Sequence, residues 1–434
     1  MELKDKILNK TAKIGIVGLG YVGLPLAVEF AKAGFEVTGI EQNPKRKQLI
    51  NDGENYIADV AADELKAAVK GGKLTAAEDF TRLGEADAIC ICVPTPLDKN
   101  KQPDISYVTS VTKHLSKTIR RGQLVVLEST TYPGTTEEIV LPKLAASGLK
   151  VGQDFFLAFS PERVDPGNQK YKTKDIPKVI GGVTPECSAM AKLLYSQFLK
   201  DIHVVSSPRV AEMEKLLENV FRSVNIALVN EMAILCRKMG IDIWEVIEAA
   251  KTKPYGFMPF YPGPGIGGHC IPLDPFYLAW KAKEYNLNTR FIELAGEIND
   301  RMPEYVVQLV QEGLNQDKKS INGAKILILG MAYKKDIGDW RESPALKIFE
   351  ILEKKRAEVD YNDPLISKIK IADRQHVSSV LKYEELGKND CVVIATDHSA
   401  YDYEQIVNNS KLIVDARNAT ARVKHHHSAR IIRI

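Results

Sequence analysis

The sequence has few of the features that mark membrane, secreted and nucleic-acid-binding proteins. No uncharged apolar run approaches the roughly 18 residues that a membrane-spanning helix needs. The first residues, MELKDKILNKTAK, lack the apolar core of a secretory signal, so we expect no such signal. With 59 basic and 56 acidic residues the net charge is only +3, which gives no reason to expect nucleic acid or an anionic membrane as a partner.

Cysteine is also scarce, with six residues in 434, which is too few for a disulfide framework. We therefore expect a soluble, cytoplasmic protein with reduced thiols. Cys90 and Cys92 lie two apart on a predicted strand, but no second cysteine pair exists to complete a metal site. We predict that both are small core residues. The other cysteines are Cys187, Cys236, Cys270 and Cys391.

Strands and helices alternate at both ends of the chain, which predicts parallel sheets with right-handed crossovers. Between them, 210–240 has unbroken helical periodicity and no proline, which predicts a long helix that joins domains or packs against a partner chain. The predicted fold class is α/β, with two Rossmann-like doubly wound domains and a helical middle. The predicted domains are 1–206, 207–313 and 314–434.

A glycine turn after the first predicted strand fits the dinucleotide-binding pattern G-x-G-x-x-G, with Gly18, Gly20 and Gly23. The helix that follows would offer its N-terminal N–H groups to a pyrophosphate. Glu41 ends the second predicted strand, where a carboxylate binds ribose hydroxyls and repels a 2′-phosphate. The pattern therefore favours a binding site for NAD. The alternative is a glycine-rich turn in an α/β fold that binds no dinucleotide.

Polar residues follow two further predicted strands. Thr95 lies between two prolines after one strand, and 128–136 (ESTTYPGTT) ends the next. The carboxyl ends of parallel strands form the ligand crevice of such sheets. These hydroxyls would hold a cofactor or a water molecule, or belong to an ordinary polar loop.

The segment 263–275, GPGIGGHCIPLDP, places Cys270 in a glycine-rich loop. Three interpretations are open: a phosphate cradle, a metal site or the seat of a nucleophile. The cofactor phosphates already have a site at Gly18–Gly23, and zinc bound by His269 lacks further ligands at useful spacing. A nucleophilic cysteine beside a hydride acceptor can trap an aldehyde as a thiohemiacetal, which a second NAD oxidises to a thioester.

Charged and amide side chains accompany this cysteine. Lys215 and Asn219 are four residues apart on the long predicted helix, with Arg222 nearby, and Asp274 follows Cys270 by four residues. A nearby cation would give the sulfur thiolate character. A further loop, SPERVDPG at 160–167, adds Glu162 and Arg163.

A second loop after a strand, LGMAYKKDIGDWRES at 329–343, keeps only Gly330 of the glycine pattern, so a second dinucleotide site is not indicated. Its Lys334, Lys335 and Arg341, with Arg417, suit a phosphate-bearing ligand, although solvated surface charge is the alternative. The histidines 425–427 are expected in a solvated tail rather than a metal site, and we expect no metal in the protein.

These segments, in this order, resemble the UDP-glucose/GDP-mannose dehydrogenase family over nearly the whole chain. The matching motifs are GLGYVGLP, CVPTP, ESTTYPGTT, SPERVDPG, AEMEKLLEN, GPGIGGHCIPLDP, GMAYKKDIGDWRES and VDYNDP. The resemblance implies an N-terminal NAD domain, a helical middle that forms a homodimer, and a C-terminal domain that grips a UDP-sugar. It also implies oxidation of the sugar C6 alcohol to a carboxylate with two NAD.

The resemblance also implies roles for individual residues. The catalytic ones are Cys270 as the nucleophile, Lys215, Asn219 and Asp274 around it, Thr130 holding a water, and Glu162 as acid or base. Those implied to contact NAD are Gly18, Gly20, Tyr21, Val22, Gly23, Glu41, Arg46, Thr95, Thr130 and Arg341. Those implied to contact the sugar nucleotide are Arg163, Val164, Lys215, Asn219, Arg222, Tyr261, Gly263, Gly265, Gly267, Tyr333, Lys334 and Arg417.

Two departures argue against UDP-glucose as the substrate. A second glutamate is typical of those enzymes shortly after the first, where this chain has RVDPG with Asp165, and Leu273 stands in place of a lysine. The stretch 253–286 resembles members of the family that act on UDP-N-acetylglucosamine, whereas enzymes for UDP-N-acetylmannosamine tend to have a His and an Arg near 251–257. UDP-N-acetylgalactosamine remains a further alternative. Outside this chemistry, the alternatives are a nucleotide-sugar-binding sensor and a two-electron dehydrogenase that needs no cysteine.

Overall fold

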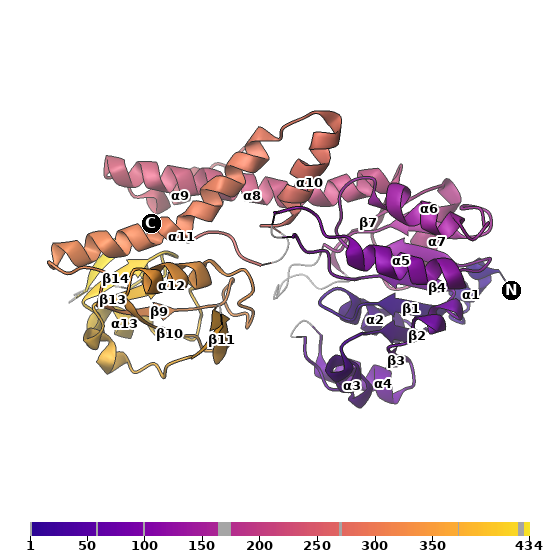
Figure 1. The fold of residues 1–434 in the computed structure, drawn as a ribbon, viewed down its shortest axis with the longest axis horizontal. Helices are drawn as coiled ribbons and strands as arrows, with labels where there is room; N and C mark the ends of the chain where they lie inside the picture. The colour runs from indigo at the N-terminus through magenta and orange to yellow at the C-terminus, as the bar shows by residue number, and fades with distance from the viewer. Residues whose placement is uncertain are drawn as a thin grey trace. The chain divides into compact units, whose positions relative to one another are not determined.

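The computed structural model describes residues 2–57, 60–98, 100–163, 175–268, 271–371, 373–423 and 429–434. By compactness the chain forms two units (Figure 1). The first unit contains Met1–Glu218 and Trp280–Leu287, and the second contains Asn219–Ala279 and Asn288–Ile434. The three-domain division made from the sequence stays a prediction.

The first unit is built on an eight-stranded sheet with strand order β3-β2-β1-β4-β5-β6-β7-β8. Its strands are β1 Lys13–Val17, β2 Glu36–Ile40, β3 Leu74–Ala77, β4 Ala88–Ile91, β5 Leu124–Leu127, β6 Phe156–Phe159, β7 Lys178–Gly182 and β8 Ile202–Val205. All neighbours pair in parallel except β6 and β7, which are antiparallel. The strands predicted before the glycine turn, Glu41, Thr95 and the ESTTYPGTT motif are β1, β2, β4 and β5. A buried apolar run has the same composition in either direction, so the reversal at β7 was not predicted.

Helices cover both faces of this sheet. They are α1 Leu3–Leu8, α2 Gly23–Lys32, α3 Pro44–Asp52, α4 Ala62–Lys70, α5 Ser106–Thr118, α6 Leu141–Ala145 and α7 Pro185–Tyr195. Successive residues of β4 face opposite sides: Cys90 packs in the cluster with α2 and α7, and Ile89 and Ile91 pack in the cluster with α5. Cys90 and Cys92 both lie in the first cluster, which confirms the prediction that they are core residues.

The predicted long helix is α8, Pro208–Met239, an unbroken run of 32 residues that begins in the first unit and ends in the second. The neighbouring helices are α9 Ile243–Lys251, α10 Asp274–Ala282 and α11 Arg290–Gln316. Together they confirm a helical middle segment. Within the part of the chain that the structure describes, none of the helices is long and apolar enough to cross a membrane.

The second unit is built on a five-stranded parallel sheet with strand order β10-β9-β13-β14-β15. Its strands are β9 Lys325–Leu329, β10 Glu358–Asn362, β13 Cys391–Ile394, β14 Leu412–Asp415 and β15 Arg430–Arg433. Helices α11 and α12, Pro344–Lys354, pack against the sheet (Figure 1). Helix α13, Tyr403–Asn409, buries Ile406 and Val407 against Val392 and Ile413. A separate antiparallel pair, β11 Lys368–Ile371 and β12 Arg374–Val377, completes the unit. The predicted α/β class with two Rossmann-like sheets is confirmed.

A buried ion pair lies where β5 and β7 meet the loops of the first unit. Lys178 Nζ donates to Glu128 Oε2 at 2.7 Å, and both side chains are buried. The Tyr195 hydroxyl donates to the other carboxylate oxygen, and Lys178 also reaches the carbonyl of Pro161 at 3.4 Å. The pair therefore joins the loop that begins at Glu128 to the loop that contains Pro161.

Removing one partner of this pair should cost far more stability than removing both. Lys178→Met leaves the Glu128 carboxylate buried without a counter-ion, so we expect a loss of about 3–5 kcal/mol in the free energy of unfolding. The double variant Lys178→Met/Glu128→Gln should recover most of that loss, because the neutral amide would still accept a hydrogen bond from Tyr195. Urea unfolding of the two variants and the wild type measures the difference. Equal destabilisation of the single and double variants would contradict a charge effect.

Candidate active site

The three glycines of the turn after β1 differ in the space that surrounds them. Gly18 has φ +88°, and a Cβ there would lie 2.6 Å from the Cys92 carbonyl oxygen. A Cβ on Gly23 would lie 1.9 Å from the Gly18 carbonyl oxygen. A Cβ on Gly20 would meet nothing within 4 Å. Packing therefore requires glycine at the first and third positions, while the space at the second suits close approach of a pyrophosphate.

The cofactor residues around this turn have defined surroundings. Glu41 directly follows β2, is buried, and accepts a hydrogen bond from the Asn43 backbone N–H at 2.9 Å through Oε1. The Arg46 guanidinium lies over the Tyr56 ring at 5.7 Å, and the Tyr56 hydroxyl donates to the Leu19 carbonyl in the glycine turn. The Tyr56 hydrogen bond and the Arg46 contact thus link Arg46 to the glycine turn that fits a dinucleotide. Of the other two predicted contacts, Tyr21 is exposed and Val22 is half-buried.

Loops after β4 and β5 are joined at the carboxyl edge of the first sheet. Thr95 Oγ1 donates to the Thr130 carbonyl at 2.7 Å, and Ser129 Oγ donates to the Val93 carbonyl at 2.8 Å. Thr95 and Thr130 are both half-buried. The structure thus brings together two residues that the sequence assigned to one crevice, as expected where parallel strands end side by side.

The loop after β6 is tied to α8. Glu162 Oε1 accepts from the Arg163 backbone N–H at 2.8 Å. The Arg163 guanidinium bonds to Glu218, lies 3.5 Å from a Glu214 oxygen, and donates to the Pro177 carbonyl at 2.7 Å. Burial and the neighbouring Glu218 raise the pKa of Glu214 to about 7. Sequence reasoning assigned Arg163 to the sugar nucleotide and missed both glutamates, although their spacing of four residues on α8 was a signal for a shared partner.

Helix α8 presents the polar residues predicted to surround the cysteine. Lys215 and Asn219 are buried and lie one helical turn apart. Asn219 Nδ2 donates to Asp274 Oδ2, and Asp274 is the buried first residue of α10. The structure therefore joins two of the predicted catalytic residues directly. Cys270, four residues before Asp274, lies outside the described residues, as do Val164, Asp165, His269 and the histidines 425–427.

Glu212, three residues before Lys215 on α8, is a buried carboxylate that anchors the helix. Glu212 accepts from the backbone N–H groups of Gly134 at 2.6 Å and Thr136 at 2.9 Å, and from Thr136 Oγ1 at 2.7 Å. Burial nevertheless raises the pKa of Glu212 to about 7. This clamp, which the sequence did not predict, holds α8 against the loop of the ESTTYPGTT motif.

In the second unit, the glycine-rich loop lies against predicted substrate residues. The Gly263 backbone N–H donates to Asn230 Oδ1 at 2.9 Å, and a Cβ on Gly263 would lie 2.9 Å from Arg417 Nη1. A Cβ on Gly267 would lie 2.6 Å from Tyr333 Cβ. The structure thus brings the loop before Cys270 close to Tyr333 and Arg417, three segments that lie far apart in the sequence.

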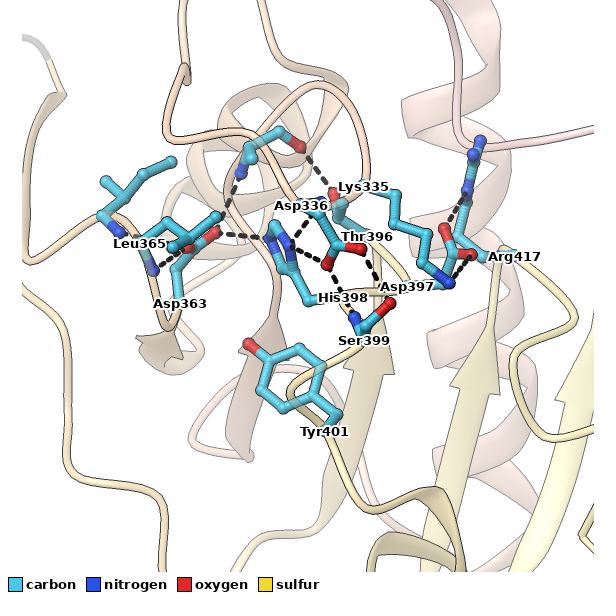
Figure 2. Close-up of polar contacts among 12 residues, drawn as sticks. Lys335, Asp336, Asp363, Leu365, Thr396, Asp397, His398, Ser399, Tyr401 and Arg417 are labelled. Carbon is cyan, nitrogen blue, oxygen red and sulfur yellow. Dashed lines mark hydrogen bonds and ion pairs between the residues drawn. The ribbon is translucent and has the colours of Figure 1, made fainter. Parts of the chain in front are cut away.

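Charges near Arg417 are arranged around one carboxylate (Figure 2). Arg417 Nε donates to Asp397 Oδ1 at 3.2 Å, and Lys335 Nζ lies 4.0 Å from Asp397 Oδ2. Two cations are therefore held near the end of the second sheet, where they suit a diphosphate. Lys334 is half-buried.

The remaining predicted contacts are distributed over other parts of the second unit. The Arg341 guanidinium donates three hydrogen bonds to the Asp339 carboxylate, at 2.9, 3.2 and 2.7 Å. The Tyr261 hydroxyl donates to Glu248 at 2.9 Å. Arg222 is exposed, and Gly265 has φ +126°. Their roles toward a ligand stay predictions.

The described cysteines have no reactive environment. Five cysteines are buried and form no disulfide bond: Cys90, Cys92, Cys187, Cys236 and Cys391. Burial raises the pKa of the Cys90 thiol to about 12 and that of Cys92 well above its ordinary value. Among the described residues, no group of three or more His, Cys, Asp or Glu side chains could hold a metal ion.

A glycine turn of this form after the first strand of a parallel sheet, with an acid after the second strand, is typical of NAD-dependent dehydrogenases. Three family models match this chain: the NAD binding domain at residues 12–199, the central domain at 209–301 and the UDP binding domain at 327–422. The chain belongs to the UDP-glucose/GDP-mannose dehydrogenase family. It is thus an oxidoreductase that uses NAD and takes a UDP-sugar as substrate.

Relatives with different sugars are about equally similar. The chain is 37% identical to the UDP-N-acetyl-D-glucosamine 6-dehydrogenase of Pseudomonas aeruginosa, over 90% of this chain and 92% of that protein. It is 38% identical to the UDP-N-acetyl-D-mannosamine dehydrogenase of Pyrococcus horikoshii, over 94% and 95%. A solved structure from Pyrococcus horikoshii, also a UDP-N-acetylmannosamine dehydrogenase, superposes with a TM-score of 0.87 at 35% identity and covers 97% and 99% of the two chains.

Gly20 and Gly18 should respond differently to a methyl group. Gly20→Ala has room in the structure, so its thermal midpoint should equal that of the wild type. Its KM for NAD should rise about ten-fold, because the added methyl separates the pyrophosphate from the backbone N–H groups. Gly18→Ala combines positive φ with a clash and should lose about 1–3 kcal/mol of stability. Thermal melts and steady-state kinetics test both variants. The KM for the UDP-sugar is the control, and an unchanged KM for NAD in Gly20→Ala would contradict the assignment.

Proposed function

We propose that the protein oxidises the C6 alcohol of UDP-N-acetylglucosamine to a carboxylate, giving UDP-N-acetylglucosaminuronate for a surface polysaccharide, in the cytoplasm. The observation that supports this chemistry best is the buried polar set on α8 and α10. Asn219 is bonded to Asp274, and Lys215 lies one turn away on the same helix. Lys215 is an ammonium, Asn219 an amide and Asp274 a carboxylate, so the three offer an oxyanion partner, a hydrogen-bond donor and a base, and Asp274 follows Cys270 by four residues.

The reaction would proceed in two oxidations and one hydrolysis. When bound, NAD supplies a hydride acceptor at C6, once for the alcohol and once for the adduct. The Cys270 thiolate attacks the aldehyde carbon and forms a thiohemiacetal, and loss of the second hydride leaves a thioester. Water then adds to the thioester carbon, the C–S bond breaks, and the carboxylate and the free thiol are released.

The residues that the family resemblance assigns to act with Cys270 have distinct tasks in this scheme. The Lys215 ammonium stabilises negative charge on the substrate oxygen as each adduct forms. Asn219, oriented by its bond to Asp274, donates its remaining N–H toward the same oxygen. Thr130 holds the water, and Asp274 and Glu162 accept or return its proton. Arg163, Tyr333, Lys334 and Arg417 bind the sugar nucleotide.

The choice of sugar rests on the segment around Cys270. The stretch 253–286 resembles enzymes for UDP-N-acetylglucosamine, and KTKPYGF at 251–257 has neither the His nor the Arg found there in enzymes for UDP-N-acetylmannosamine. The Pseudomonas aeruginosa relative acts on the former sugar by its name. UDP-N-acetylmannosamine is the second candidate, favoured by the Pyrococcus horikoshii relative and its structure.

A substrate panel tests the proposal. The protein is given UDP-N-acetylglucosamine, UDP-N-acetylmannosamine, UDP-N-acetylgalactosamine and UDP-glucose with NAD, and NADH is followed by absorbance. We expect the highest kcat/KM for the first sugar and two NADH for each sugar consumed. Cys270→Ser should lower kcat at least about a hundred-fold, because a serine hydroxyl is not ionised near neutral pH.

Each contrary outcome identifies a different error. A preference for another sugar refutes the substrate and leaves the mechanism standing. One NADH for each sugar, unaffected by Cys270→Ser, indicates a two-electron dehydrogenase. UDP binding without turnover of any sugar indicates a binding protein.

A homodimer through the central helices is part of the proposal. Helix α8 carries a stripe of exposed apolar side chains at spacings of three, four and seven residues, which places them on one face. The stripe consists of Met213, Leu217, Phe221, Leu228, Met232, Leu235 and Met239. A helix that exposes such a continuous stripe is expected to bury it against a second copy of the chain.

Charge placed in the stripe should therefore separate the subunits. The double variant Leu228→Glu/Leu235→Glu should elute as a monomer, whereas Val380→Glu, at an exposed apolar position outside α8, should keep the mass of the wild type. Size-exclusion chromatography with light scattering measures both masses. A wild-type mass for the α8 variant would rule out this face as the interface.

A further inference from the structure

His398 occupies a fully buried position beside the loop that follows β9. It comes four residues after the end of β13, and its side chain has no exposed surface. β13 is the direct neighbour of β9, so the segment that contains His398 and the loop 330–336 leave the same edge of the second sheet. Because the imidazole is completely covered, it does not itself reach a ligand. Its role must therefore depend on the groups that its two ring nitrogens bind by hydrogen bonds.

The two nitrogens of His398 have partners of opposite character (Figure 2). Nδ1 accepts a hydrogen bond from the Asp336 backbone N–H at 3.0 Å. A backbone N–H can only donate, so Nδ1 has no proton. Nε2 lies 3.1 Å from Asp363 Oδ2, which as a carboxylate can only accept. The two contacts together require a neutral ring with its proton on Nε2.

Asp363 is held in the ionised form that this arrangement needs. Its Oδ2 also accepts from the backbone N–H groups of Met331 at 2.7 Å and Ala332 at 3.0 Å. Its Oδ1 accepts from the N–H groups of Leu365 at 2.8 Å and Ile366 at 3.0 Å. Although burial opposes it, the His398 bond and these N–H groups lower the pKa of Asp363.

The bonds of His398 thus connect the two ends of one short loop. Asp363 binds the loop at Met331 and Ala332, and His398 binds it at Asp336. Further ties strengthen each end: Thr396 Oγ1 donates to the Ala332 carbonyl at 2.5 Å, and Ser399 donates to the Asp336 carboxylate through its backbone N–H and its hydroxyl, each at 2.7 Å. Between the two ends lie only residues 333–335.

Residues 333–335 are the part of this loop that we relate to binding of the nucleotide. Tyr333 and Lys334 are proposed to bind the sugar nucleotide, and Lys335 shares Asp397 with Arg417. Tyr333 also packs against the glycine loop, since a Cβ on Gly268 would lie 3.0 Å from Tyr333 Cε2. A displacement of the loop end at Asp336 would therefore move side chains that face both the nucleotide and the segment before Cys270.

We propose that His398 is a positioning residue for UDP binding, which as the neutral Nε2–H tautomer links Asp363 to Asp336 and fixes the loop that carries Tyr333 and Lys334. The inference rests on the proposed role of that loop in binding the nucleotide. Without the link, the loop remains attached at Ala332 but loses its backbone anchor at Asp336. UDP then has to order the loop when it binds, which lowers its affinity.

Three substitutions separate the two bonds of His398. His398→Phe removes both bonds and keeps a ring. His398→Asn keeps an acceptor near the position of Nδ1, and His398→Gln keeps a donor near the position of Nε2. The control is His376→Phe, which changes an imidazole of the same unit that packs on Phe349 at 4.8 Å. Binding of UDP is measured by titration calorimetry, which requires no turnover, and KM values are measured for the UDP-sugar and for NAD.

The expected result is a selective loss at the nucleotide. His398→Phe should raise the Kd of UDP and the KM of the UDP-sugar about ten-fold, with the KM of NAD unchanged. His398→Asn should restore the affinity to within about three-fold of the wild type, because it still accepts from Asp336, whereas His398→Gln should not. His376→Phe should leave both values unchanged.

Other outcomes overturn the inference. Wild-type UDP affinity in His398→Phe would do so, as would an equal loss in His376→Phe or an equal rise in the KM of NAD. If His398→Phe does not fold, the comparison of His398→Asn with His398→Gln decides, and equal affinities of those two variants reject the role of the Asp336 bond. A wild-type protein that does not bind UDP would instead refute the proposed function.

Discussion

The structure depends on one property of parallel sheets: the carboxyl ends of neighbouring strands meet at the same edge. In the first unit this edge gathers the glycine turn after β1, Thr95 after β4 and Thr130 after β5. In the second unit it gathers Tyr333 after β9, His398 after β13 and Arg417 after β14. Residues far apart in the sequence thus become neighbours at one edge of a sheet. A Rossmann-like sheet can therefore serve a dinucleotide in one unit and a UDP group in the other, because the loops at this edge carry the binding residues.

Buried carboxylates give these loops their shape. Asp363 collects four backbone N–H groups, and Asp415, at the end of β14, accepts from the N–H groups of Arg417, Ala419 and Thr420. Glu212 does the same for the loop at Gly134 and Thr136. A backbone N–H that leaves a strand has no ladder partner, and an acid placed there satisfies several at once. The acids near the proposed site therefore serve mostly as scaffolding, and only a few are left for chemistry.

Much of this architecture could be predicted from the sequence, because apolar runs, glycine spacing and helical periodicity are local signals. The predicted strands are present as β1, β2, β4, β5 and β9, and α8 and the glycine turn are present too. The antiparallel step between β6 and β7 was not predictable, since pairing direction is a property of the whole sheet. Arg163 shows a similar limit: its sequence motif indicated a ligand contact, while its partners Glu214 and Glu218 come from a helix about fifty residues away. The four-residue spacing of the two glutamates indicates a shared partner, but nothing in either segment identifies that partner as Arg163.

The buried positions of five cysteines have a practical consequence for chemical labelling. Cys90, Cys92, Cys187, Cys236 and Cys391 are covered in the native protein, and burial keeps the thiols of Cys90, Cys92 and Cys391 from ionising. An alkylating reagent reacts with exposed thiolates and so has little access to these five sulfurs. Label taken up by the native protein would therefore report on Cys270, the residue proposed as the nucleophile. If Cys270 has the proposed role, the stoichiometry of labelling counts the active sites in a preparation, and protection by NAD or by a UDP-sugar shows which ligand covers the thiol.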